Sequence, residues 1–91
     1  MNESLAQSQE MLRAFLQAEL QLVPHLIGTA HGFFCIGDRE VAFQSMHRSD
    51  EALGVVERFA VELPAAGRSA ILQSAAELRA SMRLVQRLAS Q

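Results

Sequence analysis

The sequence predicts an all-α protein, a small antiparallel bundle of three to four helices in a single helical domain spanning residues 1–91. Apolar residues recur at intervals of three and four along almost the whole chain, which is the spacing of one helix face. β-branched residues are sparse, and the alternating patterns typical of strands are missing. We also find no internal repeat and no low-complexity linker, so one domain is expected.

The first segment carries a broad apolar stripe. Its central positions are Leu5, Leu12, Leu16, Leu20, Val23 and Ile27, and it is widened by Met11, Phe15, Leu22 and Leu26. Such a broad stripe predicts burial against more than one neighbour. Pro24 lacks an amide proton and disfavours helical dihedrals at Val23. The segment is therefore either one kinked helix or two helices, the second beginning near Pro24.

Gly37 and Asp38 predict the corner between the first segment and the next helix. Glycine adopts the left-handed conformation that ends a helix at low cost. Aspartate caps a helix by accepting hydrogen bonds from the amides of residues two and three positions later. We therefore expect both residues to have a structural role.

The second helix is predicted by a seam whose spacings alternate between four and three. The seam residues are Ala42, Met46, Ser49, Leu53, Val56, Ala60 and Leu63. This spacing is typical of packing against neighbouring helices. Gly54 lies beside the seam, where we expect it to permit a close approach of another helix. Pro64 follows the seam and suits the first turn of a further helix.

The stretch PAAGRSA, residues 64–70, is either a loop or the beginning of the last helix. The apolar stripe of that helix is Ile71, Ala75, Leu78, Met82, Val85 and Ala89. Arg79, Arg83 and Arg87 are expected on its solvent side, where the arginines nearest the carboxyl end also suit the helix dipole.

The apolar content predicts a partner. Hydrophobic residues make up 49% of the chain, yet a domain this short buries only about 60 to 65% of the surface of its unfolded chain. A thin core cannot easily hide that much apolar surface. We therefore expect part of it to be covered by another protein or by a second copy, and a homo-oligomer follows from the second case.

Charge is divided unevenly between the two ends of the chain. Residues 1–38 carry four acids against Arg13, whereas residues 64–91 carry four arginines against Glu77. The first and last helices should therefore attract each other. The net charge of -2 and the absence of tryptophan and tyrosine argue against nucleic acid as a partner.

Cysteine usage and hydropathy predict a cytoplasmic protein without a membrane span. Cys35 is the one cysteine, so the chain forms no internal disulfide, and the first ten residues lack the pattern of a signal peptide. Residues 20–37 contain no acid or base, but Pro24, His25, His31 and three glycines dilute their hydropathy too far for a span. A buried helix is expected there.

Neither a metal site nor a catalytic site is predicted. His31 and Cys35 lie four positions apart and share a helix face, but a structural zinc site needs four ligands. A nucleophilic Cys35 would need an orienting group and a cleft besides the base His31. Phosphotransfer through His31 lacks a neighbouring cation. We expect no cofactor and no enzyme; the alternative is a small metal- or ligand-binding helical protein that uses His31, Cys35 and His47.

The corner resembles one tetratricopeptide unit. The residues that carry the resemblance are Leu26, Ala30, Phe33, Gly37, Ala42, Met46 and Ser49. Thr29 stands where that family has leucine, and Gly54 stands where it has proline. The resemblance covers about a third of the chain and occurs once. It implies a packed helical hairpin and, by analogy, a protein-binding role.

The function predicted best is a non-catalytic helical protein–protein interaction module: an adaptor, a chaperone-like binder or a subunit that also associates with itself. This prediction is based on the apolar stripes of every predicted helix. Leaving apolar area exposed to water costs about 25 cal/mol per Å², which favours covering it with a partner. The expected core or interface anchors are Phe33, Phe34, Met46, Leu53 and Val56.

Overall fold

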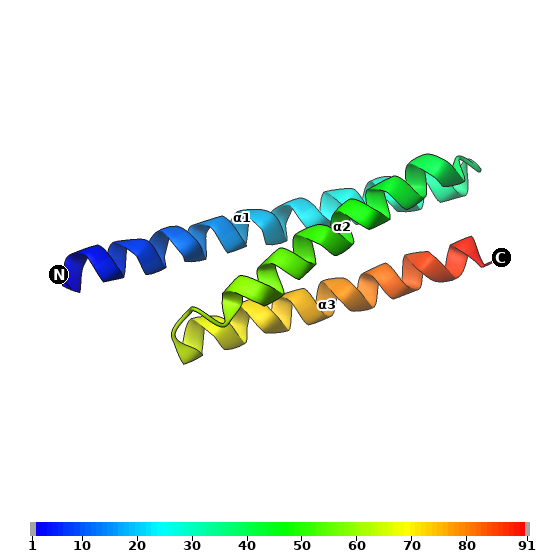
Figure 1. Ribbon diagram of the computed structural model, residues 1–91. Helices are drawn as coiled ribbons and strands as arrows, with labels where there is room; N and C mark the ends of the chain where they lie inside the picture. Colours follow the sequence, from blue (N-terminus) through cyan, green and yellow to red (C-terminus); the bar gives the residue numbers. More distant parts are fainter. Residues whose placement is uncertain (1, 91) are drawn as a thin grey trace.

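Residues 2–90 fold into three helices, α1 (Asn2–Cys35), α2 (Arg39–Ala60) and α3 (Ala65–Ala89), in a computed structural model that describes side chains from residue 7 to residue 90. No strand occurs in this range. α2 runs back along α1, and α3 turns again to lie beside both (Figure 1). The all-α prediction is therefore confirmed, and residues 2–90 form a bundle of three helices.

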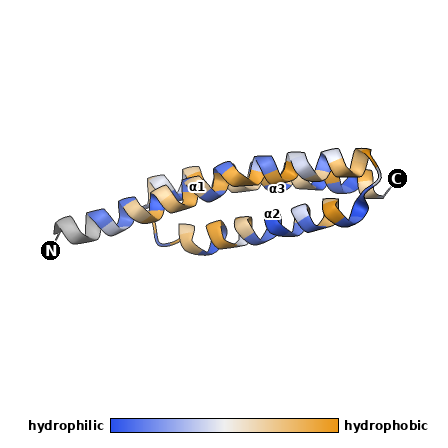
Figure 2. Ribbon diagram, turned by 90° about the horizontal axis from the view of Figure 1, so that it is seen from above, coloured by the Kyte–Doolittle hydropathy of each residue, from blue (hydrophilic) through white to orange (hydrophobic). Residues whose placement is uncertain are grey.

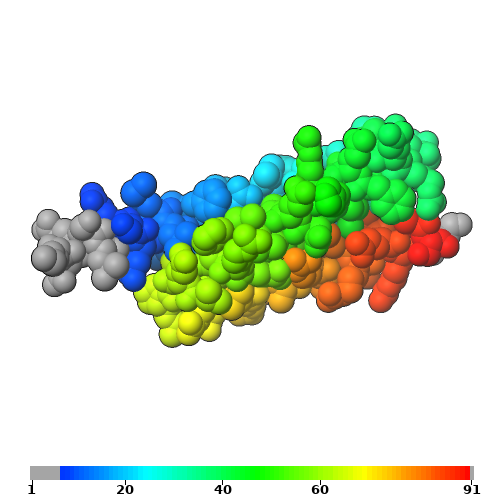
Figure 3. Space-filling model, viewed as in Figure 1, coloured from blue at the N-terminus to red at the C-terminus, as the bar shows by residue number. Residues whose placement is uncertain are grey.

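The bundle is long and thin. Its extents are 54 × 18 × 15 Å, and its radius of gyration is 15.3 Å, against about 12 Å for a compact domain of this length. The space-filling view shows this rod-like shape (Figure 3). α1 is the longest helix, and its first turns extend beyond the α2–α3 turn (Figure 1). Each helix is therefore covered by its neighbours on one side and faces solvent on the other.

α1 continues through Pro24 as one helix, so Pro24 does not separate two helices. Leu16, Val23 and Ile27 of the predicted stripe are buried, but Met11 and Leu22 are exposed. The prediction that the whole broad stripe is buried is therefore wrong, because α2 and α3 cover only the centre of it. Leu5 belongs to the residues whose side chains are not described.

The corner at Gly37 has the expected helix-ending geometry. Gly37 adopts a φ of 84°, its amide donates to the carbonyl of Phe34 at 3.2 Å, and the amide of Asp38 donates to that of Phe33 at 2.9 Å. This pair of bonds is a Schellman motif. The Asp38 carboxylate then accepts a bond from the Val41 amide at 3.3 Å and caps α2. The corner therefore reverses the chain within three residues.

The core lies between the three helices. Every residue of the predicted α2 seam is buried, and Ser49 satisfies its hydroxyl by donating to the Ser45 carbonyl at 3.0 Å. α3 begins at Ala65, so the stretch 64–70 is the beginning of a helix. Its stripe contributes Ile71, Ala75, Met82 and Val85 to the core. Orange, apolar residues accordingly follow all three helices (Figure 2).

Gly37→Ala and Gly54→Ala should change stability in opposite directions. At Gly37 the positive φ strains any side chain, so we expect a loss of about 1 kcal/mol in the free energy of unfolding. At Gly54 a methyl group would meet no atom within 4 Å. Gly54 therefore serves no close helix approach, contrary to the prediction, and alanine should add up to about 1 kcal/mol through helix propensity.

Urea denaturation of the two variants beside the wild type measures both effects. Shifts of the same sign would contradict this account of the corner.

Candidate functional site

Arginine side chains form hydrogen bonds between α2 and α3. Arg79 of α3 donates to Glu57 of α2 at 2.6 and 2.7 Å and to Asp50 at 2.9 Å. Near the corner, Arg39 donates to the carbonyl of Ala89 at 2.8 Å. These bonds fasten the two helices along the outer edge of their contact. We call Arg79, Glu57 and Asp50 the arginine clasp.

The clasp keeps its cation at every ordinary pH. The hydrogen bonds to Glu57, and then those to Asp50, raise the pKa of the Arg79 guanidinium further above its ordinary value. Because the pKa of Arg79 is raised in the folded state, the protonated guanidinium stabilises the fold fully at any pH below the ordinary arginine pKa. This stabilisation is lost only as the pH rises above that ordinary pKa. Arg79 therefore has a structural role and no role in proton transfer near neutral pH.

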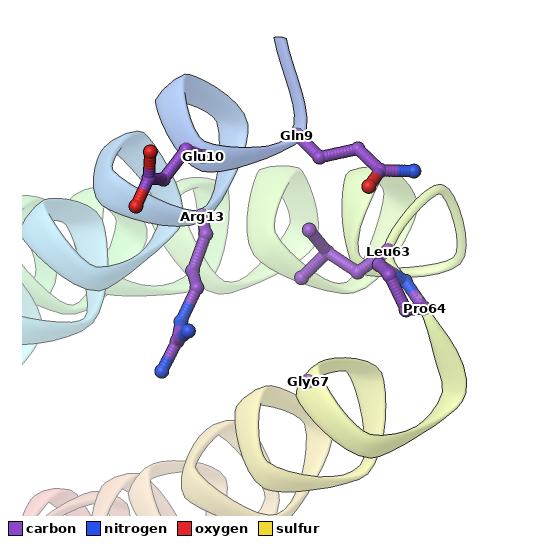
Figure 4. A pocket seen from close by; sticks show the side chains of 6 residues that line it. All are labelled: Gln9, Glu10, Arg13, Leu63, Pro64 and Gly67. Carbon is purple, nitrogen blue, oxygen red and sulfur yellow. The ribbon is translucent and has the colours of Figure 1, made fainter. Parts of the chain in front are cut away.

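A shallow hollow of about 430 Å³ lies where α1 passes the α2–α3 turn. Its lining residues are Gln9, Glu10, Arg13, Leu63, Pro64 and Gly67. Arg13 extends toward α3, whereas Glu10 points away from it (Figure 4). The hollow combines one acid, one cation, one amide and an apolar wall, and none of its lining side chains is a nucleophile such as serine or cysteine.

The seam between α1 and α2 is apolar. A groove of about 330 Å³ runs along it, with Leu22 and Leu26 on the α1 side and Ala52 and Val55 on the α2 side. Glu19, Arg48 and Glu51 complete its lining. Leu22 remains 46% exposed even though it lines this groove. The groove therefore presents apolar side chains to solvent between two helices.

The apolar surface continues along α1 from the groove toward the amino end. Met11 is 72% exposed, and Phe15 is also exposed. Both lie within about 40° of Leu22 around the helix, at 100° per residue. They therefore lie on the same side of α1 as Leu22. We call these residues and the groove lining the α1/α2 face: Met11, Phe15, Glu19, Leu22, Leu26, Arg48, Glu51, Ala52 and Val55.

Two opposite charges on the α1/α2 face have no ion pair among the described side chains. Glu51 pairs with His47 at 2.8 Å along α2. Glu19 and Arg48 line the same groove but form no ion pair within this part of the chain. The face therefore offers one acid and one base as well as apolar area.

The predicted anchors divide into two groups. Met46, Leu53 and Val56 are buried in the core, so they are not available to a partner while the bundle is folded. Phe33 and Phe34 are half-buried near the corner. The ring of Phe34 packs edge-on against Phe43 at 5.2 Å, and the Arg39 guanidinium lies 5.6 Å from the centre of the Phe43 ring.

The three candidate ligands do not come together. His31 Nε2 and Cys35 Sγ lie 3.9 Å apart on exposed α1, whereas His47 lies on α2 and pairs with Glu51. Among the side chains that the structure describes, residues 7–90, no group of three or more His, Cys, Asp and Glu gathers in metal-binding geometry. Nor is any helix in this range long and apolar enough to cross a bilayer.

Two features of the surface were missed by reasoning from the sequence. The solvent-side position predicted for Arg79 is wrong, because Arg79 is half-buried and forms the clasp with Glu57 and Asp50. The spacing of Asp50 and Glu57 by seven residues is the signal that places both acids on one side of α2. The exposure of Met11, Phe15 and Leu22 had no such signal, since it depends on where α2 and α3 lie.

Compared with models of protein families, with curated proteins and with solved structures, the chain gives no match.

Proposed function

We propose that this chain is a non-catalytic protein–protein interaction module, an adaptor, chaperone-like binder or subunit, that binds an amphipathic helix on its α1/α2 face. The observation that carries the proposal is the row of exposed Met11, Phe15 and Leu22 beside an apolar groove. Exposed large apolar patches mark interaction sites in proteins of this kind.

The shape of the face suits a helix. A groove between two helices accepts side chains spaced by three and four residues from a third helix. An added helix would bring α1 and α2 to the packing of a four-helix bundle. Glu19 and Arg48 at the groove would provide orientation through charged contacts.

The remaining expectations enter the proposal with their own support. The hairpin from Leu26 to Ser49 packs in a tetratricopeptide-like, antiparallel manner, which the full burial of Ala30, Ala42 and Ser49 supports. The cytoplasm is the proposed location, because an exposed thiol such as Cys35 stays reduced there.

Photo-crosslinking in the cell tests the proposed function. A photoreactive amino acid at position 22 should yield one discrete adduct, because Leu22 lies in the proposed contact. The matched control is position 84: Leu84 is 60% exposed on α3, and it is not among the α1/α2 face residues. Equal labelling from both positions, or no adduct from position 22, would refute the proposed binding face.

A further inference from the structure

We propose that the α1/α2 face binds the same face of a second copy of this chain, around a two-fold axis that crosses α1 and α2 near Leu22 and Ala52. The inference rests on the proposed function of that face and names its partner. In the resulting dimer, α1 and α2 of both copies form a four-helix core, with each α3 on the outside.

The surface area of one copy fits such a dimer. The chain exposes 6148 Å², whereas a compact monomer of 10.0 kDa exposes roughly 5,200 Å². The excess of roughly 900 Å² is close to the area that one partner buries in a standard interface, about 800 Å². The elongated shape therefore leaves about as much spare surface as a stable dimer needs.

The position of the axis follows from the charges. α1 ends at Cys35 and α2 begins at Arg39. Residues of the two antiparallel helices whose numbers add to about 74 therefore lie at the same height along the long axis of the bundle, which we call level. Leu22 and Ala52 are such a pair. Glu19 lies three residues before Leu22, about 4.5 Å toward the α2–α3 turn. Arg48 lies four residues before Ala52, about 6 Å toward the Gly37 corner.

A two-fold axis at Leu22 and Ala52 turns the second copy end over end, so its α2–α3 turn lies on the side of the first copy's Gly37 corner. Glu19 of one copy then lies level with Arg48 of the second copy, to within about one residue step. Inside one copy the two side chains lie about 10 Å apart along the bundle, which explains why they form no ion pair there. The pairing occurs twice in the dimer, because the interface is isologous.

The same axis covers the exposed end of α1. Met11 of one copy becomes level with Phe33 of the other, since the two positions lie eleven residues on either side of Leu22. Phe33 is only half-buried within its own chain. A parallel arrangement would instead place Glu19 level with Val55 and Arg48 level with Leu26, leaving each charge against an apolar residue. The pairing of Glu19 with Arg48 therefore favours the antiparallel dimer, in which the two Glu51 side chains lie near the axis, each paired with His47 of its own chain.

Light scattering after size exclusion, across a wide range of concentration, tests the proposal. The wild type should have twice the mass of the 10.0 kDa chain and dissociate on dilution. Leu22→Asp should weaken the dimer by at least about tenfold, because it places a charge at the centre of the contact. Leu84→Asp, the matched control, should leave the dimer unchanged. Circular dichroism verifies that both variants keep their helices.

Charge reversal tests the axis. Glu19→Arg and Arg48→Glu should each weaken the dimer by about tenfold, because like charges then become level across the interface. The double variant restores opposite charges and should return to within about threefold of the wild type. A double variant as weak as the single variants would overturn the proposed axis.

Failure of this inference is distinguishable from failure of the proposed function. A wild-type monomer, or a dimer equally strong in Leu22→Asp and Leu84→Asp, would show that a second copy is not the partner of this face. If position 22 still crosslinks to a different protein, the proposed function stands. If position 22 also yields no adduct, both are refuted.

Discussion

Val56→Glu should leave the chain largely unfolded. The Val56 side chain is 0% exposed and lies in the core formed by all three helices. A carboxylate there lies among apolar side chains, and burying its charge while losing the packing of the valine costs about 5 kcal/mol or more. A small domain has about 5 kcal/mol of stability in total. Circular dichroism at 222 nm should therefore fall to less than half of the wild-type signal at room temperature.

Val61→Glu is the matched control for this prediction. Val61 follows directly after α2 and is 60% exposed. The new carboxylate stays in water, so the change in stability should stay within about 0.5 kcal/mol. A Val56→Glu protein with the melting temperature of Val61→Glu would contradict the core described above. It would also restore Val56 as a candidate contact for a partner.

Arg79→Met should lower the melting temperature by about 10 °C. Methionine keeps the length of the side chain but removes the charge-assisted hydrogen bonds to Glu57 and Asp50. Such a partly buried network contributes about 1–2 kcal/mol, and for a chain of this size 1 kcal/mol corresponds to about 4–8 °C. Differential scanning calorimetry measures the shift directly.

Arg83→Met provides the comparison for the clasp. Arg83 is exposed on the same helix and forms no ion pair among the described side chains. Its replacement should change the melting temperature by less than about 3 °C. The difference between the two variants should also decrease in 1 M salt, because salt screens the exposed part of the network. Equal shifts for both arginines would show that α2 and α3 are not held together through Arg79.

Reasoning from the sequence predicted the elements well where local chemistry decides them. The Gly37 turn, the Asp38 cap and the whole seam of α2 depend on residue type and spacing, and the structure has all of them. Pro24 was ambiguous, since a proline both removes a hydrogen bond and is tolerated within long helices. α1 continues through it because the buried residues on both sides, Val23 and Ile27, pack in one core.

The candidate site was less predictable than the fold. Met11, Phe15, Leu22 and Leu26 belong to the same stripe as Leu16 and Val23 in the sequence, and all six suit a core. Leu16 and Val23 are buried in the bundle, Leu26 is half-buried, and Met11, Phe15 and Leu22 are exposed. Which residues fall on which side depends on the angle at which α2 and α3 approach α1. No pattern of neighbouring residues in the sequence predicts that angle.

The sequence by itself determined that the chain is helical, where α2 begins, which residues of α2 and α3 turn inward, and that apolar residues exceed what a thin core holds. Helix periodicity, capping and turn chemistry act within a few residues, so they can be read in order along the chain. The tertiary structure alone decided that Arg79 joins Glu57 and Asp50, and that Met11, Phe15 and Leu22 stay exposed on the α1/α2 face. Both depend on the spacing and rotation of helices that are far apart in the sequence.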